Sequence, residues 1–190
     1  MHLFSSCFHF RALLYKSEKY TYAKISEEPF DGSLLIYGVK GIKGGAKRTS
    51  AYINKDIISK NKEWIDKYKL FFTTSYSTNA IVPPEDIISE PGSVCTETFI
   101  VIGPFNTKQE MMNCHKYLQT DFVHALLYFG HGTMQVTASV FQFVPLQDFT
   151  LNSDINWNQD SEKINIQLYN KYKLQKEEIS FIEKTISSIE

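Results

Sequence analysis

The sequence predicts an α+β fold, because runs with strand character fill its first half and runs with helical periodicity dominate its second half. Of the 190 residues, 43% are apolar and 22% are charged, which is the composition of an ordinary globular protein. We expect a mixed or antiparallel sheet with flanking helices over residues 1–150, followed by a helical C-terminal tail over residues 151–190.

Short β-branched and aromatic runs that end at glycine, proline or polar residues predict the strands. These runs are residues 34–39, 49–53, 70–76, 87–90, 94–102 and 136–144. The basic loop between the first two runs is rich in glycine. The spacing of its glycines matches neither the phosphate-binding loop of nucleoside triphosphatases nor the dinucleotide-binding fingerprint. We therefore expect no nucleotide site in this loop.

Apolar residues at helical spacing predict the helices. They are expected over residues 61–69, 108–119, 121–129, 164–171 and 177–188. Trp64, Ile65 and Tyr68 form the apolar stripe of the first helix, and Thr107 with Glu110 forms a capping box at the start of the second. The polar segment 150–160 is expected to be a linker.

The net charge of −1 conceals an uneven distribution of charge. The basic residues of segment 40–69 are Lys40, Lys43, Lys47, Arg48, Lys55, Lys60, Lys62, Lys67 and Lys69, against Asp56, Glu63 and Asp66. Acidic residues outnumber lysines from Asp148 to Glu190. One basic face of this kind favours binding to a polyanion, because each neutralised phosphate releases counterions. The alternative is a lysine-rich loop and helix that only face solvent.

The sequence lacks the motifs of adenine methylation and of metal-dependent DNA cleavage. The segment 82–85, VPPE, has two prolines but lacks the Asn or Asp and the aromatic residue that flank them in the adenine methylation loop. The strands contain no Glu-x-Lys that would help to hold Mg²⁺ for cleavage. Cys114, His115 and His124 lack a metal-ligand spacing, and Cys95 lies in a run expected to be buried. We predict no catalytic residue and no metal site in this chain.

Compartment and membrane association can also be judged from the sequence. The three cysteines, Cys7, Cys95 and Cys114, fit a reducing cytoplasm rather than a disulfide framework. Residues 1–14 lack the features of a signal peptide, and no stretch approaches the ~20 apolar residues of a membrane span. We therefore expect a soluble cytoplasmic protein with no membrane partner.

Several stretches carry a resemblance to a known family. They are residues 87–105 (IISEPGSVCTETFIVIGPF), 116–122 (KYLQTDF), 143–149 (FVPLQDF), Trp157, 168–174 (LYNKYKL) and 178–183 (EISFIE), with weaker likeness at 51–55 and 67–69. In order and spacing this pattern resembles the C-terminal target-recognition region of type II restriction-modification adenine methyltransferases, some of which are fused to endonucleases. The likeness runs from about Ser33 to the end, and the segment 129–135 departs from it.

The resemblance implies a curved sheet with flanking helices that reads a DNA sequence while a methyltransferase domain, absent from these residues, flips and methylates adenine. Its partners would be double-stranded DNA and a methyltransferase or nuclease domain in the same or another chain. The intact protein would use S-adenosylmethionine, and Mg²⁺ if it also cleaves DNA, whereas this chain alone would need no cofactor and would not be an enzyme.

The basic segment and the resemblance together nominate residues for DNA binding. The candidates are Lys40, Lys43, Lys47, Arg48, Tyr52, Lys55, Lys60, Thr74, Ser75 and Tyr76. Arg48 is the side chain among the first four that can make a bidentate contact to guanine. Two other classes stay open. The chain could be a nuclease or hydrolase whose ligands converge without a sequence signature, or a protein-interaction module that uses an exposed stripe of Ile179, Ile182 and Ile186.

Overall fold

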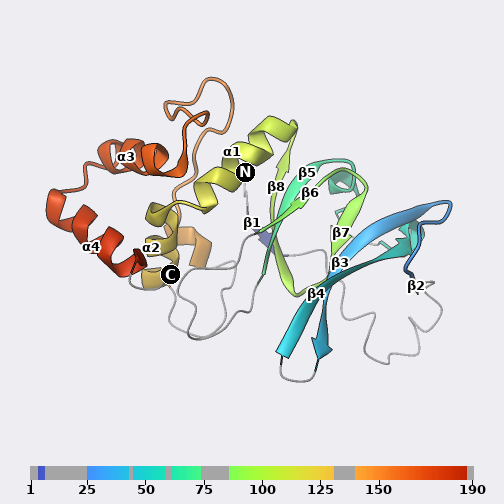
Figure 1. Cartoon of the computed structure of the whole chain (residues 1–190). Helices are drawn as coiled ribbons and strands as arrows, with labels where there is room; N and C mark the ends of the chain where they lie inside the picture. The colour runs from blue at the N-terminus through green and yellow to red at the C-terminus, as the bar shows by residue number, and fades with distance from the viewer. Residues whose placement is uncertain are drawn as a thin grey trace. The chain divides into compact units, whose positions relative to one another are not determined.

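The computed structural model of the protein describes residues 4–6, 25–42, 45–58, 61–73, 86–130 and 140–187. Contacts divide the chain into two compact units, which interleave along the sequence (Figure 1). Unit 1 consists of Met1–Phe72 and Ile87–Asn106, and unit 2 of Thr73–Asp86 and Thr107–Glu190. The sheets are built from unit 1, and the helices α1 to α4 belong to unit 2. The expected α+β class is confirmed, whereas the compact units do not divide at the expected boundary of residue 150.

One sheet of unit 1 has the strand order β1-β8-β5-β6. Its strands are β1 (Phe4–Ser6), β8 (Phe99–Phe105), β5 (Tyr68–Thr73) and β6 (Ile87–Ser89). β1 runs antiparallel to β8, and β5 runs antiparallel to β6. Leu70, Phe71 and Phe72 are all buried, so both faces of β5 are covered.

The second sheet of unit 1 has the order β2-β4-β3-β7. Its strands are β2 (Ile25–Ser26), β4 (Gly45–Asn54), β3 (Ser33–Ile42) and β7 (Ser93–Cys95). β3 and β4 form a long antiparallel hairpin, paired from Ser33 with Asn54 to Ile42 with Gly45. β7 runs parallel to β3 but pairs only with residues 35–37, and β2 pairs only with residues 52 and 53 of β4. The hairpin is therefore longer than the described strands beside it.

Two apolar clusters cover opposite faces of the β3–β4 hairpin. Residues of even number on β3 join one cluster, made of Leu34, Ile36, Ile53, Ile58 and Val94. Tyr37 and Val39, of odd number, pack against the other, which we call the sheet-joining cluster and which consists of Phe71, Cys95, Phe99 and Val101. Since successive side chains of a strand point to opposite faces, this alternation places the hairpin between two layers of core.

Unit 2 is an assembly of helices. They are α1 (Lys108–Leu118), α2 (Asp121–Gly130), the 3-10 helix η3 (Val140–Phe143), α3 (Ser161–Lys171) and α4 (Lys176–Ser187). The predicted cap of α1 is confirmed, since Thr107 Oγ1 accepts a hydrogen bond from the Glu110 amide at 3.2 Å. α2 lies at the centre and packs against α1, α3, α4 and η3. None of the helices in the described ranges has the length and apolarity needed to cross a membrane.

Three predictions of secondary structure in unit 1 are wrong. The basic loop expected between residues 39 and 49 is strand over its described residues, since β3 continues to Ile42 and β4 begins at Gly45. The helix expected over 61–69 is a single 3-10 turn, η2 (Lys62–Trp64), followed by strand β5, and another turn, η1 (Lys55–Ile57), precedes it. Asn61, the expected cap, has a left-handed backbone with φ 52° and makes no capping bond. The strand expected over 94–102 is split into β7 and β8 by a turn in which the Phe99 amide donates to the Thr96 carbonyl at 3.2 Å.

Two further expectations in unit 2 also fail. Of the strand expected over 136–144, residues 140–143 form the 3-10 helix η3, and 136–139 lie outside the described residues. The expected linker 150–160 packs into the unit instead, with Ile155 and Trp157 buried. Buried Ile164, Leu168 and Tyr169 likewise anchor α3. The C-terminal helices are therefore an integral part of unit 2.

Candidate nucleic-acid interface

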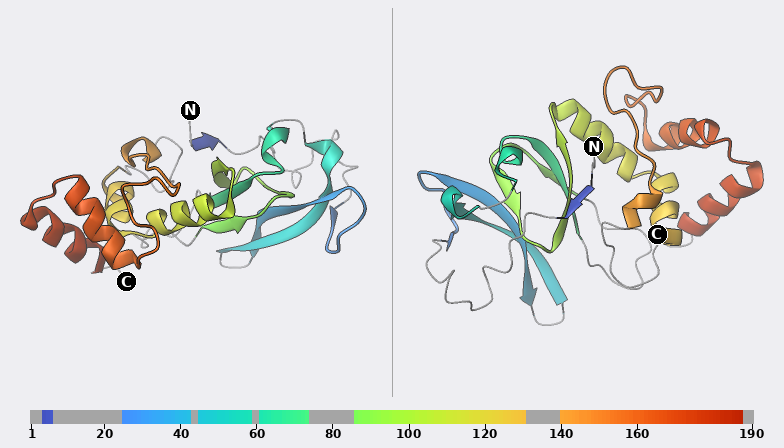
Figure 2. Two further views of the ribbon diagram at one scale, coloured as in Figure 1. Left: turned by 90° about the horizontal axis from the view of Figure 1, so that it is seen from above. Right: turned by 180° about the vertical axis from the view of Figure 1, so that it is seen from behind.

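The outer end of the β3–β4 hairpin is a ribbon of two strands. We define this distal ribbon as residues 38–42 of β3 and 45–49 of β4, which lie beyond the residues paired with β7 and β2. Figure 1 and the right panel of Figure 2 show β3 and β4 running together past the ends of the other strands. Of the four basic candidates of highest rank, Lys40, Lys47 and Arg48 fall in this ribbon.

Lysines occupy directly opposite positions in the distal ribbon. Lys40 of β3 pairs with Lys47 of β4 in the antiparallel register. Lys47 is exposed, Arg48 is half-buried, and the side chain of Lys40 lies outside what the structure describes. Paired positions of this kind are about 5 Å apart, so two like charges there destabilise the free hairpin. An anion beside the ribbon would relieve that repulsion.

The remaining candidates are not all brought to the ribbon. Tyr52 lies at the base of the hairpin opposite Leu35, and Lys55 follows the end of β4. At about 3.3 Å per strand residue, Lys55 lies roughly 25 Å along the chain from Lys47. Lys43, Lys60, Thr74, Ser75 and Tyr76 lie outside the described residues. The structure thus groups Lys40, Lys47 and Arg48 and separates Lys55 from them.

One lysine of the basic segment has a structural role. Lys69 is fully buried, and its Nζ donates to the carbonyl oxygens of Trp64 at 2.8 Å, Ile65 at 3.3 Å and Lys67 at 2.7 Å. Burial lowers the pKa of Lys69 to about 8. All three N–H donors of the Lys69 ammonium group bond to carbonyls of the turn before β5, so none is left to bind a ligand.

Two exposed hydroxyl residues of β4 were not nominated from the sequence. Thr49 lies in the distal ribbon opposite Gly38, and Ser50 follows it opposite Tyr37. Both side chains are exposed. Their position in an alternating strand beside the basic residues was visible in the sequence, and it is the signal that could have found them.

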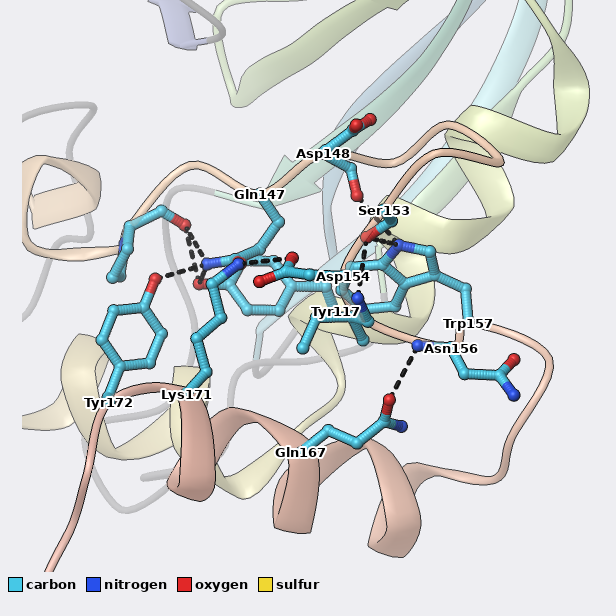
Figure 3. Close-up of polar contacts among 12 residues, drawn as sticks. Tyr117, Gln147, Asp148, Ser153, Asp154, Asn156, Trp157, Gln167, Lys171 and Tyr172 are labelled. Carbon is cyan, nitrogen blue, oxygen red and sulfur yellow. Dashed lines mark hydrogen bonds and ion pairs between the residues drawn. The ribbon is translucent and has the colours of Figure 1, made fainter.

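Unit 2 contains a polar cleft of about 350 Å³. It is lined by Gln109, Asn113, Thr150, Leu151, Ser153, Asp154, Ile155, Asn156, Trp157, Asn158 and Gln167. Several polar groups around it bond to one another (Figure 3). Trp157 Nε1 donates to the Asp148 carbonyl at 2.9 Å, the Asn156 amide to Gln167 Oε1 at 2.7 Å, and Lys171 Nζ to Asp154 Oδ1 at 2.7 Å. These bonds hold the loop 148–158 in place, and a lining with one carboxylate and no cation does not suit phosphate.

Several titratable groups are buried among the described residues of unit 2. Asp86 Oδ1 accepts from Gln119 Nε2 at 2.8 Å and lies 3.0 Å from His115 Nδ1, while Asp86 Oδ2 is buried without a hydrogen-bond partner. Burial raises the pKa of the neighbouring Cys114 thiol well above its usual value, and burial lowers the pKa of His124 to about 4. The thiol therefore stays protonated, which suits neither a nucleophile nor a metal ligand. Within the described ranges, no group of three His, Cys, Asp or Glu residues is placed to hold a metal ion.

No protein-family model matches the chain, and comparisons with curated proteins and with solved structures find no match either.

Proposed function

We propose that this chain binds double-stranded DNA in a sequence-specific manner, as the target-recognition part of a restriction-modification methyltransferase or endonuclease. The observation that carries the proposal is the distal ribbon, a two-stranded projection that presents Lys47 and Arg48 and has Lys40 opposite Lys47. Cationic side chains hold backbone phosphates, and hydroxyl or guanidinium groups beside them can reach base edges.

The chemistry belongs to another domain in this proposal. The chain positions the DNA, and a methyltransferase domain in the same or another chain uses S-adenosylmethionine to methylate adenine. Mg²⁺ is required there only if the intact protein also cleaves. The cytoplasm is the proposed compartment, since both DNA and the cofactor are present in it.

A salt series tests the proposal. The affinity for a fluorescent duplex of mixed sequence is measured by anisotropy, starting at about 50 mM salt, for the wild type and for Lys47→Ala/Arg48→Ala. We expect log K to fall linearly with log salt, and the double variant to flatten the slope because it removes two positive charges from the ribbon. Lys176→Ala/Lys184→Ala, which changes two exposed lysines of α4, is the matched control and should keep the wild-type slope. Absence of wild-type binding at low salt would overturn the proposal.

A second candidate function is a protein-interaction module without DNA binding of its own. The isoleucine stripe does not favour it as expected, because Ile186 is buried and Ile179 and Ile182 are half-buried. A different feature does favour it: Phe129 and Phe181 are more than half exposed, at 54% and 59%, and their rings stack at 5.7 Å. If the wild type fails to bind DNA, Phe129→Ser/Phe181→Ser becomes the variant to compare for assembly with a catalytic partner.

A further inference from the structure

Neighbouring candidate residues of β4 lie on opposite faces of the distal ribbon. Side chains alternate along a strand, and directly paired residues share a face. Thr49, Lys47 and their partners Gly38 and Lys40 therefore occupy one face, which we call the 47/49 face. Arg48 and its partner Val39 occupy the other. Lys47 and Arg48 therefore cannot both point toward the same surface of a ligand.

Each face of the hairpin meets an apolar cluster near its base. On the 47/49 face, the hairpin residues in that cluster are Leu34, Ile36 and Ile53, which lie outside the distal ribbon. On the other face, Val39 lies within the ribbon directly opposite Arg48 and packs against the sheet-joining cluster, and Arg48 itself is half-buried. Lys47 and Thr49 are both exposed. Within the ribbon, the 47/49 face therefore offers the more exposed side chains to a ligand as large as DNA.

The width of the ribbon fits the major groove of DNA. Two strands about 4.8 Å apart fit the major groove of B-DNA, which is about 12 Å wide and admits a two-stranded ribbon. At its base the hairpin has β7 on one side and β2 on the other, and a sheet of that width does not enter. Within the described residues of this hairpin, the distal ribbon is the part narrow enough to enter.

The residues on the open face have suitable chemistry for base edges. A lysine can donate to guanine O6 and N7, and a threonine offers a hydroxyl to base edges and a methyl group to thymine. Gly38 faces Thr49 without a side chain, and a Cβ there would meet only the Thr96 side chain, at 3.4 Å. The protein itself therefore tolerates alanine at this position, so a loss of binding in Gly38→Ala would report the approach of DNA.

We infer that the ribbon enters the major groove of duplex DNA with its 47/49 face toward the bases, that Lys47 and Thr49 determine base preference, and that Arg48 does not read bases. This inference rests on the proposed DNA binding. It assigns to Thr49 the base contact that was predicted for Arg48.

The test compares the DNA sequences selected by the wild type with those selected by variants of single ribbon residues. The wild type is incubated with duplexes that have a randomised central segment, and the retained duplexes are sequenced to give the base preference at each position. The same selection is run with Thr49→Val, Gly38→Ala and Arg48→Lys, which keeps the charge but loses the bidentate fork. Ser50→Ala, which also removes one exposed hydroxyl from β4 but lies on the Arg48 face, is the matched control.

We expect Thr49→Val to lower the preference at one base-pair position by about tenfold, the order of a single base-edge contact. Gly38→Ala should weaken binding to the selected duplex by about the same factor, while circular dichroism shows an unchanged fold. Arg48→Lys and Ser50→Ala should leave the base preference unchanged. A single strand of the selected sequence should bind at least about tenfold more weakly than the duplex.

The outcomes separate this inference from the proposed function. If Arg48→Lys shifts the base preference and Thr49→Val does not, the proposed sequence-specific DNA binding stands, but the face assigned to the bases is wrong. If single strand and duplex bind equally, entry into the major groove is wrong. If the wild type retains no duplex at all, the proposed function fails first.

Discussion

His124 is buried on α2, and its Nε2 has no hydrogen-bond partner. Burial lowers the pKa of His124 from 6.5 to about 4, so between these values the unfolded chain binds a proton that the folded chain does not. The free energy of unfolding should therefore fall as the pH falls through this window, by about 3 kcal/mol in total. Urea unfolding followed by tryptophan fluorescence at several pH values measures this loss.

The control for this prediction is His124→Asn, a polar replacement that does not titrate. The difference in unfolding free energy between wild type and variant should shrink or reverse from pH 7 toward pH 4. Equal pH dependence of the two proteins would show that His124 is not the group responsible.

Two buried tyrosines of unit 2 differ in the hydrogen bonds of their hydroxyl groups. Tyr117 OH donates to the Pro145 carbonyl at 2.8 Å and accepts from Gln147 Nε2 at 3.4 Å, whereas Tyr169 OH is buried without a partner. Tyr117→Phe should lower the free energy of unfolding by about 1 kcal/mol, and Tyr169→Phe should leave it unchanged or raise it, because an unpaired buried hydroxyl costs desolvation energy. Both variants remove one oxygen, so each is the control for the other in urea unfolding. A larger loss in Tyr169→Phe than in Tyr117→Phe would contradict the assigned bonding.

The candidate site could be predicted from the sequence only in part. Lys40, Lys47 and Arg48 were expected in a loop between two predicted strands, whereas β3 and β4 continue through these positions and bring them together in the hairpin register. Alternation along the observed strand splits Lys47 and Arg48 between two faces, but which face is more exposed depends on the packing of Val39 in three dimensions. The burial of Lys69 could not be foreseen, because the carbonyls that bind it come from a turn that was expected to be helix.

At the scale of elements, errors arose where a pattern fits two structures. Trp64, Ile65 and Tyr68 are spaced as on a helix, but the same residues also fit a turn followed by a strand. The run 94–102 was predicted as one strand because its β-branched and aromatic residues favour strands, whereas the turn falls at the polar residues 96–98 within it. The helices α1, α2, α3 and α4 were found close to their observed bounds, since caps and a change of period mark them.

The register of the hairpin predicts that stability and DNA binding respond oppositely to one substitution. Lys47→Glu places opposite charges at the directly paired positions 40 and 47. The free energy of unfolding should rise by roughly 0.5 kcal/mol, while affinity for the duplex should fall by more than about tenfold. Thermal unfolding and anisotropy measure the two effects on the same sample. Lys184→Glu on α4 is the control and should change neither strongly, and an affinity unchanged in Lys47→Glu would remove Lys47 from the interface.

At the scale of the whole molecule, the chain passes between its two units more than once. Residues 73–86 belong to unit 2 although they lie between two segments of unit 1. Asp86, the last residue of this segment, is held by His115 of α1 and by Gln119, which follows α1. Neither unit is therefore made from one continuous segment of the chain.

Removal of residues 151–190 should consequently damage the fold rather than release a tail. The truncated chain 1–150 lacks Trp157, Ile164 and Leu168, all of which are buried, and it exposes the faces of α1 and α2 that they cover. We expect loss of the near-ultraviolet circular dichroism of unit 2 and aggregation during purification. A soluble fragment 1–150 with the near-ultraviolet spectrum retained would show that the C-terminal helices are dispensable.

The distal ribbon also bears on self-association. Beyond residue 37 of β3 and before residue 52 of β4, no described strand pairs with the outer edges of the hairpin. Unpaired edges of this kind add strands from other molecules, and lysine is one of the residues by which natural sheets prevent it. Lysines at positions 40 and 47 thus protect these edges from pairing, apart from any contact with DNA. An alanine variant with weaker DNA binding can owe part of that loss to ribbons of separate molecules that pair with each other.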